Sequence, residues 1–402
     1  MRRTVSAGMK MKTTAPFSLA LVASIAVMAC GSDVNQAPSS GAGGDATSAS
    51  SSTGGTGGGG VTEPWHEACP RDEREQRLID VGEVSLNVAC RGSGPTVVFL
   101  HGFPEFHYSW DKVMDELAGE FRLVAPDQRG YNISDKPPEV ADYLLPKLAD
   151  DILKLLPLVS AEPVILVAHD WGGPVGWLVA HHADAHIRGF MATNGPHPAR
   201  FADLIANDAE QQAASEYMSF FRSDTAELVL TPDYIVKNFF DFLSPADEVI
   251  YLEALSQPGA ITGGLNWYRA NDIGVASTEK IMAEVSPTVD VPVSVLWGLD
   301  DTAVLPKNAE GLEPYAPDLK VETFPGVDHW IEHRIPSEVA EAIRALDARI
   351  TPRGPRPTAA AACVFSGFPG ATRDRGWRRV VRFTRIFIEF HALGDPLAAT
   401  TL

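Results

Sequence analysis

Short apolar runs, several of them rich in β-branched residues, alternate with helical stretches between residues 75 and 350. An apolar run of about four to eight residues bounded by turn residues is typical of a strand that is buried on both faces. The strands expected on this basis span residues 78–81, 84–88, 96–100, 122–126, 163–167, 190–194, 293–297 and 321–324. The helices expected around them span residues 110–117, 148–159 and 336–350. This alternation predicts an α/β fold, in which a mostly parallel sheet is flanked by helices.

The alternation of strands and helices is interrupted between residues 195 and 292. This stretch is helix-like and carries many aromatic residues, namely Phe220, Phe221, Tyr234, Phe239, Phe240, Phe242, Trp267 and Tyr268. An insertion between two strands of a parallel sheet lies over their carboxyl ends, which is where ligands bind in such sheets. We therefore predict one folded domain over residues 62–350, with a helical lid over about residues 196–287 inserted before the last strands.

The N-terminal residues have the pattern of an export signal. Residues 1–30 contain four basic residues, which are followed by an apolar core over residues 17–29. The letters VMAC at residues 27–30 resemble the cleavage box of bacterial lipoproteins, although Met28 stands where a small residue is usual. The resemblance implies cleavage before Cys30 and attachment of lipid to its thiol. Secretion after cleavage at a nearby bond is the alternative.

Two segments of biased composition flank the expected domain. Residues 31–61 are almost entirely Ser, Gly, Ala and Thr, and such a segment buries too little apolar surface to fold, so it predicts a flexible tether. A lipid on Cys30 would hold the domain near a membrane through this tether. We therefore expect an exported lipoprotein of the cell envelope, on its periplasmic or surface side. Residues 351–402 begin with a Pro-rich linker and continue as a basic tail, to which no role is assigned.

Charge and cysteine usage exclude several classes of partner and cofactor. The chain of 402 residues has a formal net charge of −19, which argues against nucleic acid as a partner. The sequence contains no CxxC motif and no Cys/His cluster, so we expect neither a metal nor another cofactor. In an exported protein, Cys69 and Cys90 are expected to form a disulfide, with two unrelated thiols as the alternative.

The strand over residues 163–167 leads into a turn with Asp170 at its apex. Two glycines and an apolar helix-like stretch follow, and strand, sharp turn and helix together are the context of a nucleophile elbow. Serine is usual at this apex, but a carboxylate needs no base to remove a proton before it attacks. Asp170 therefore indicates attack on an sp³ carbon that bears a leaving group, such as an epoxide oxygen or a halide. The product of that attack is an ester.

Four motifs stand in the order and context of a known superfamily: HGFPEF at 101–106, AHDWGG at 168–173, WGLDD at 297–301 and GVDHW at 326–330. On these motifs, the region from Trp65 to Ile350 resembles the α/β-hydrolase superfamily and, within it, the soluble epoxide hydrolases. The resemblance implies the α/β-hydrolase fold, an aspartate nucleophile at Asp170, and water as the second substrate.

The resemblance also implies which residues hydrolyse the ester. His329 follows the turn at Gly326 and matches the histidine that activates water. Asp301 lies at the spacing of the acid that orients this imidazole, with Asp300 as the neighbouring alternative. His169 is a second candidate for this base because it adjoins Asp170, but its side chain is expected to turn back into the packing of the elbow.

Backbone groups and lid residues complete the implied site. The backbone N–H groups of Phe103 and Trp171 are the expected oxyanion donors. Tyr217 and Tyr268 stand where related epoxide hydrolases carry two lid tyrosines that donate to the epoxide oxygen as the ring opens. Tyr251 is the alternative to Tyr217, and aromatic packing alone is the alternative role for these tyrosines.

Together these residues predict an epoxide hydrolase that converts a small hydrophobic epoxide and water into a vicinal diol. A haloalkane or haloacid dehalogenase with the same nucleophile is the alternative. The haloalkane enzymes need a second halide donor, which the side chain of Phe103 does not offer, and fluoroacetate-type relatives need several arginines, for which only Arg129 is a candidate. Asp170 argues against a serine esterase, and the complete residue set argues against a binding module without turnover.

Overall fold

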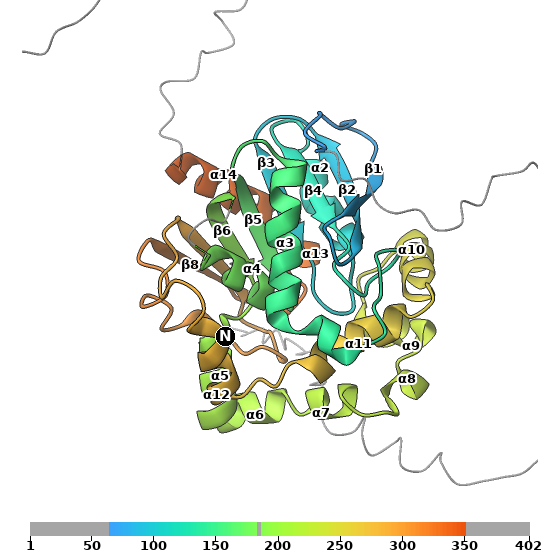
Figure 1. Cartoon of the computed structure of the whole chain (residues 1–402), viewed down its shortest axis with the longest axis vertical. Coiled ribbons are helices and arrows are strands. Elements are labelled where there is room, and N and C mark those ends of the chain that lie inside the picture. The colour runs from blue at the N-terminus through green and yellow to red at the C-terminus, as the bar shows by residue number, and fades with distance from the viewer. Residues whose placement is uncertain (1–63, 183–185, 351–402) are drawn as a thin grey trace, which may run out of the picture. The chain divides into compact units, whose positions relative to one another are not determined.

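The computed structural model describes residues 64–182 and 186–350 of the chain. The predicted signal peptide with Cys30, the tether and the basic tail lie outside the described residues. An eight-stranded sheet with the order β1-β2-β4-β3-β5-β6-β7-β8 forms the centre of the domain (Figure 1). Its strands are β1 (Glu75–Asp80), β2 (Ser85–Gly92), β3 (Thr96–Leu100), β4 (Arg122–Pro126), β5 (Val164–His169), β6 (Ile187–Thr193), β7 (Val293–Gly298) and β8 (Leu319–Phe324).

Most of the sheet is parallel. Neighbouring strands from β4 to β8 run in the same direction, whereas β2 runs antiparallel to both β1 and β4. Every residue of β3, β4, β5 and β7 is buried, as expected for strands that are covered on both faces. The predicted α/β fold with a mostly parallel sheet is therefore confirmed.

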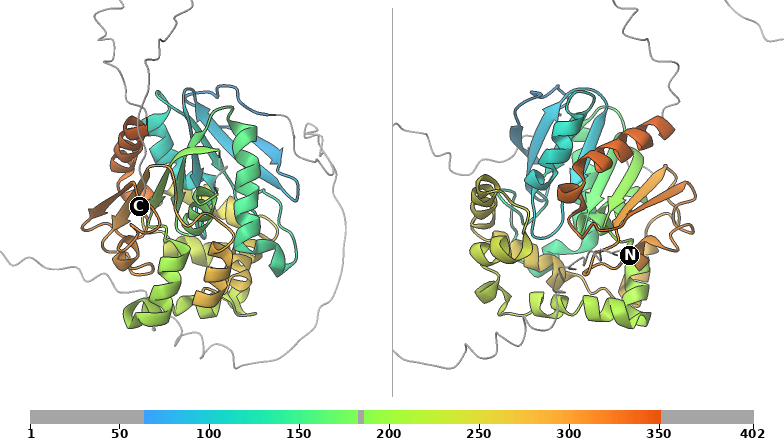
Figure 2. Two further views of the ribbon diagram at one scale, coloured as in Figure 1. Left: turned by 60° about the vertical axis from the view of Figure 1, so that its left-hand side comes forward. Right: turned by 180° about the vertical axis from the view of Figure 1, so that it is seen from behind.

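Helices cover the two faces of this sheet in separate layers. α3 and α4 pack on one face (Figure 1), and α2 and α14 pack on the other, which is seen from behind in Figure 2. Side chains along β3 point alternately to the two helix layers: Val98 packs with α3 and α4, and Phe99 packs with α2 and α14. The helices of these layers are α2 (Asp111–Leu117), α3 (Leu145–Val159), α4 (Gly172–Ala180) and α14 (Pro336–Ile350). Shorter helical segments are η1 (His107–Trp110), η2 (Val140–Tyr143), η3 (Pro306–Ala309) and α13 (Ile331–Arg334).

The connection between β6 and β7 forms the helical lid at one end of the sheet (Figure 2). Local signals start several of its helices; for example, Ser244 caps α10 and exchanges hydrogen bonds with Asp247 in a capping box. Its helices are α5 (Pro198–Asn207), α6 (Ala209–Ala214), α7 (Tyr217–Phe221), α8 (Ala226–Val229), α9 (Pro232–Phe239), α10 (Pro245–Leu255), α11 (Ala260–Ala270) and α12 (Val275–Met282).

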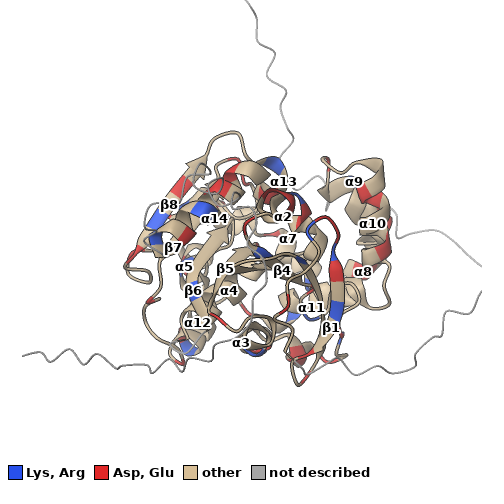
Figure 3. Ribbon diagram, turned by 90° about the horizontal axis from the view of Figure 1, so that it is seen from above, with Lys and Arg blue, Asp and Glu red and all other residues tan. Residues whose placement is uncertain are grey.

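Charged residues lie mainly on the outer elements of the domain. Figure 3 shows them on β1, β8 and α10, whereas the inner strands β5 and β7 have none. None of the helices within the described ranges combines the length and the apolar character that crossing a bilayer requires.

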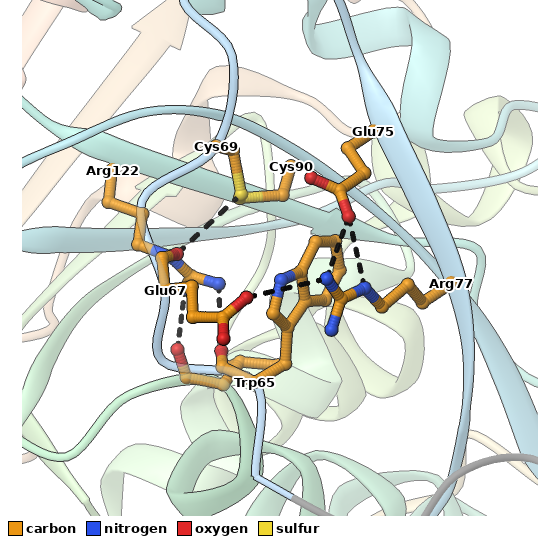
Figure 4. The surroundings of a disulfide bond; sticks show 8 residues. Trp65, Glu67, Cys69, Glu75, Arg77, Cys90 and Arg122 are labelled. Atoms are coloured by element: carbon orange, nitrogen blue, oxygen red, sulfur yellow. Dashed lines mark hydrogen bonds and ion pairs between the residues drawn. A yellow bond between two sulfur atoms is a disulfide. The ribbon is translucent and has the colours of Figure 1, made fainter.

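A disulfide bond joins Cys69, in the segment before β1, to Cys90 of β2 (Figure 4). The same segment is held by Arg122 of β4, whose guanidinium donates hydrogen bonds to the carbonyl oxygens of Trp65 and Glu67 at 2.8 and 2.7 Å. Because Trp65 is buried, these contacts fix the N-terminal segment to the edge of the core.

Replacing both cysteines by alanine is expected to lower the free energy of unfolding by about 3 kcal/mol, because the bond closes a loop with a sequence separation of 21 residues in the unfolded chain. Urea unfolding of the wild type and the double variant, each with and without reductant, measures this change. Reductant should shift the wild-type midpoint to that of the double variant and leave the variant unchanged. A wild-type midpoint that ignores reductant would contradict the prediction.

Candidate active site

The turn between β5 and α4 exposes Asp170 to the lid side of the sheet. Its backbone has a φ of 48°, in the left-handed region that non-glycine residues seldom adopt. Close contacts around the turn leave no room for larger residues, since a Cβ on Gly172 would lie 2.6 Å from the carbonyl oxygen of Leu100. The backbone N–H of Phe103 donates a hydrogen bond of 2.8 Å to Asp170 Oδ1. One carboxylate oxygen is therefore held by the loop after β3, and the other, Oδ2, faces His329.

His329 lies between Asp170 and Asp301. Its Nε2 is 3.5 Å from Asp170 Oδ2, and its Nδ1 is 2.7 Å from Asp301 Oδ2. Asp301 follows β7 and is itself fixed, because Asn194 Nδ2 donates to Oδ2 at 2.6 Å and the backbone N–H of Val304 donates to Oδ1 at 2.9 Å. The neighbouring Asp300 is exposed and accepts from a backbone N–H rather than from the imidazole.

The carboxylates of Asp170 and Asp301 and the imidazole of His329 stabilise one another's charged forms. Burial alone would lower the pKa of His329, but the carboxylates of Asp301 and Asp170 raise it well above its usual value. Burial alone would raise the pKa of Asp301, but His329 and the hydrogen bonds of Asn194 and Val304 lower it. The arrangement therefore favours an imidazolium between two carboxylates as long as Asp170 is ionised.

A cavity of about 190 Å³ opens over Asp170, between the sheet and the lid. Tyr217 of α7 and Tyr268 of α11 line it together with Asp170 and Trp171. Burial, followed by the nearby Asp170 carboxylate, raises the pKa of Tyr217; burial, followed by Tyr217 and Asp170, raises that of Tyr268. Both phenols therefore keep their protons at neutral pH. The rest of the lining is mostly apolar and includes Leu144, Leu145, Pro174, Pro196, Pro198, Phe201, Met218, Ala270, Ile273, Ile281 and Val304.

The remaining residues singled out from the sequence have separate positions. Trp171 follows Asp170 in the chain and is the N-cap residue of α4, and its role as an oxyanion donor stays a prediction. Tyr251 does not line the cavity; its hydroxyl is buried and donates to Glu105 Oε1 at 2.9 Å. His169 is buried beside His329, with 4.8 Å between the ring centres, and does not contact the cavity.

Comparison with known proteins identifies the family. The family described as having the α/β-hydrolase fold matches residues 95–332. The chain belongs to the α/β-hydrolase fold family. This α/β-hydrolase is 34% identical over 284 residues to AB hydrolase superfamily protein YfhM of Bacillus subtilis, covering 66% of the chain and 96% of that protein.

Several relatives of this α/β-hydrolase carry the name epoxide hydrolase. It is 31% identical over 279 residues to Epoxide hydrolase 2 of Caenorhabditis elegans, covering 65% of the chain and 77% of that protein. Among solved structures, an epoxide hydrolase from Bacillus megaterium in complex with an inhibitor matches with a TM-score of 0.61 and 29% identity, covering 67% of this chain and 99% of that one. The chain is thus a hydrolase that groups with the epoxide hydrolases of its fold.

A second buried cluster of the hydrolase was not expected from the sequence. Glu105, His169 and Glu332 each bring one oxygen or nitrogen to a common point, and these atoms lie within 4.8 Å of one another. Carboxylates and an imidazole are donor types that bind divalent metals. Glu105 stands within a motif quoted above, but neither its burial nor its approach to Glu332 leaves a signal in the sequence pattern.

Proposed function

We propose that this α/β-hydrolase opens epoxides by attack of Asp170 and hydrolyses the resulting ester to a vicinal diol. The observation that carries the proposal is the apolar cavity, in which a carboxylate at a nucleophile elbow faces two protonated phenols. The naming of relatives at about 30% identity as epoxide hydrolases supports the same activity.

In the first step, Asp170 Oδ2 attacks one carbon of the epoxide while the N–H of Phe103 holds Oδ1. The C–O bond of the ring breaks, and the departing oxygen takes a proton from Tyr217 or Tyr268. An alkoxide is a poor leaving group near neutral pH, so this donation lowers the barrier to ring opening. The cavity supplies apolar contacts for the rest of a small hydrophobic substrate.

In the second step, His329 takes a proton from water, and the hydroxide adds to the carbonyl carbon of the ester. The negative charge that develops on Oδ1 is stabilised by the N–H of Phe103 and by that of Trp171. The tetrahedral intermediate then collapses, and the bond between the carbonyl carbon and the ester oxygen Oδ2 breaks. Oδ2 leaves with the alkyl group and takes a proton from His329. The products are the diol and Asp170 as a carboxylic acid, and the proton of this acid passes to His329, which restores the carboxylate and the imidazolium of the free enzyme.

Formation of the ester also prepares the base. The free enzyme holds His329 between two carboxylates, which favours the imidazolium. Esterification of Asp170 removes one of these charges, so the pKa of His329 falls. The imidazolium then gives its proton to the tyrosinate that ring opening leaves, which restores the phenol and makes available the neutral imidazole that activates water. Asp301 remains to orient it.

Single turnover in heavy-oxygen water tests the mechanism. With enzyme in excess over styrene oxide, the ester route transfers an ordinary oxygen from Asp170 to the diol and leaves the heavy atom in the peptide that contains Asp170. Heavy oxygen in the diol and none in the peptide would contradict the ester. If the protein consumes a short bromoalkane but not the epoxide, it is a dehalogenase and the proposed function is wrong.

Tyr268→Phe is expected to slow ring opening by about 10²-fold, because removal of one phenol removes one proton donor to the leaving oxygen. Tyr217→Phe should have a comparable effect, and the double variant should lose more than either. Rapid-quench measurement of ester formation separates this step from hydrolysis, whose rate should change little. Tyr234→Phe is the matched control, because Tyr234 belongs to the lid helix α9 and does not line the cavity. Full activity in the double phenylalanine variant would exclude the tyrosines as acids.

Export and the lipid on Cys30 remain proposals from the sequence. A mass spectrum of the protein from its native membrane fraction measures them directly, because lipid attachment adds the mass of its acyl chains to a chain that begins at Cys30.

A further inference from the structure

The cluster of Glu105, His169 and Glu332 contains fewer hydrogen-bond donors than hydrogen-bond acceptors. All three side chains are fully buried. Nδ1 of His169 lies 3.2 Å from Glu332 Oε1 and 3.7 Å from Glu105 Oε2. Two carboxylates and an unprotonated imidazole nitrogen repel one another in a dry interior, so at least one proton must reside among these atoms.

Hydrogen bonds identify Glu105 as the ionised member. Its Oε1 accepts from the hydroxyl of Tyr251 at 2.9 Å and from Nε2 of His333 at 2.7 Å. Two donors on one oxygen stabilise the negative charge. Burial alone would raise the pKa of Glu105, but His333 beside it lowers that pKa.

The backbone identifies the tautomer of His169. Its Nε2 lies 2.9 Å from the carbonyl oxygen of His329, and a carbonyl oxygen can only accept, so Nε2 carries the hydrogen. Burial, followed by the neighbouring imidazole of His329, lowers the pKa of His169 to about 4, which keeps the ring neutral. Its Nδ1 is then a bare acceptor that points at Glu332.

Glu332 is left as the place for the proton. Neither of its oxygens receives a hydrogen bond from another group in the described parts of the chain, whereas Oε1 of Glu105 receives two. We propose that Glu332 is a positioning residue that remains a neutral carboxylic acid in the folded protein and donates its hydrogen to His169 Nδ1. His169 is thereby fixed in the tautomer that holds the carbonyl group of His329.

This inference rests on the proposed role of His329 as the base. A neutral His169 places no second positive charge beside the imidazolium, although the two rings are only 4.8 Å apart. Burial, followed by the charge of Glu105, raises the pKa of Glu332 well above its usual value, in agreement with the geometry. The titratable groups around Glu332 are Glu105, His169, His329, His333 and Tyr251.

Infrared spectroscopy at about pH 8 tests the proton directly. The wild type should show the carbonyl stretch of a protonated carboxylic acid, and Glu332→Gln should lack it. Glu338→Gln is the matched control, because Glu338 is an exposed carboxylate in the adjoining helix α14, and this variant should retain the band. Absence of the band from the wild type, or a stoichiometric divalent metal in the purified protein, would overturn the proposal.

Single-turnover kinetics test the positioning role. Glu332→Met has a similar length but no donor, so hydrolysis of the ester should slow by about 10²-fold, with little change in ester formation. Glu332→Gln has an N–H₂ group that can donate to His169, so it should recover most of the hydrolysis rate. A Gln variant as slow as the Met variant would refute the role. If the wild type forms no ester, the proposed function fails, while the infrared result still decides where the proton lies.

The stability of the protein should also depend on this proton. A carboxyl group whose pKa is raised by folding contributes less to stability as pH rises from its unfolded pKa toward its folded pKa. The melting temperature of the wild type should therefore fall relative to that of Glu332→Gln between about pH 5 and about pH 8. Parallel melting curves across this range would contradict a neutral Glu332.

Discussion

Asp170→Asn is expected to abolish diol formation, lowering kcat by at least about 10⁴-fold. Asparagine has the same shape, tolerates the left-handed backbone at this apex, and still offers Phe103 an acceptor oxygen. It lacks the negative charge that attacks the epoxide. Chromatographic measurement of diol from styrene oxide gives the rate, and an unchanged melting temperature shows that the fold is intact.

Asp300→Asn is the control for this variant. Asp300 is an exposed acid next to Asp301, and it contacts neither His329 nor the cavity, so its replacement should leave kcat within about twofold. If Asp170→Asn retains a substantial rate while it remains folded, the nucleophile lies elsewhere.

His329→Gln is expected to form the ester and then stall, lowering kcat by about 10³-fold. Ring opening needs only Asp170 and the tyrosines, whereas hydrolysis needs the base. Intact mass should therefore show one hydroxyalkyl group per chain after incubation with styrene oxide, and peptide mapping should place it on Asp170. Rapid diol formation without any adduct would contradict the assignment of His329.

The combination of His329→Gln and Asp170→Asn controls for nonspecific alkylation, since it should collect no adduct. The same incubation with a bromoalkane and with fluoroacetate distinguishes the alternative chemistry. An adduct from a halide and none from the epoxide would identify a dehalogenase.

Local pattern was sufficient to predict the strands and the layer helices of the fold. Apolar runs between turn residues identify β3, β4, β5 and β7 because both faces of these strands are covered. The boundaries were less accurate where pairing decides them. β1 begins at Glu75 rather than at residue 78, since Glu75 pairs with Cys90 and extends a hairpin whose first residues are partly buried or exposed.

The site was predictable where its residues stand in contiguous motifs. Asp170 follows β5 directly and His329 follows β8 after a short turn, so a local sequence context specifies their place at the carboxyl edge of the sheet. The choice of Asp301 over Asp300 depends on which side chain turns inward after β7, and only the packed structure brings Asp301 to 2.7 Å from the imidazole.

The cluster around Glu332 could not be predicted in this way. Its members come from the loop after β3, the end of β5 and helix α13, and a buried acid looks like an exposed one in a single sequence. The protonation state of Glu332 follows from the hydrogen bonds of residues that only the fold brings together. The same reason applies to the cavity, whose volume depends on how the lid side chains pack.

In the proposed mechanism the nucleophile and the base come from the sheet and the proton donors come from the lid, and this division has an evolutionary consequence. Asp170, Asp301 and His329 extend from loops of the sheet, whereas Tyr217 and Tyr268 both belong to the single connection between β6 and β7. Mutation or recombination within this one insertion can therefore change the proton donors and the shape of the pocket while the hydrolytic machinery is inherited intact. New substrates become accessible by exchange of a contiguous gene segment, without renewed selection of the triad.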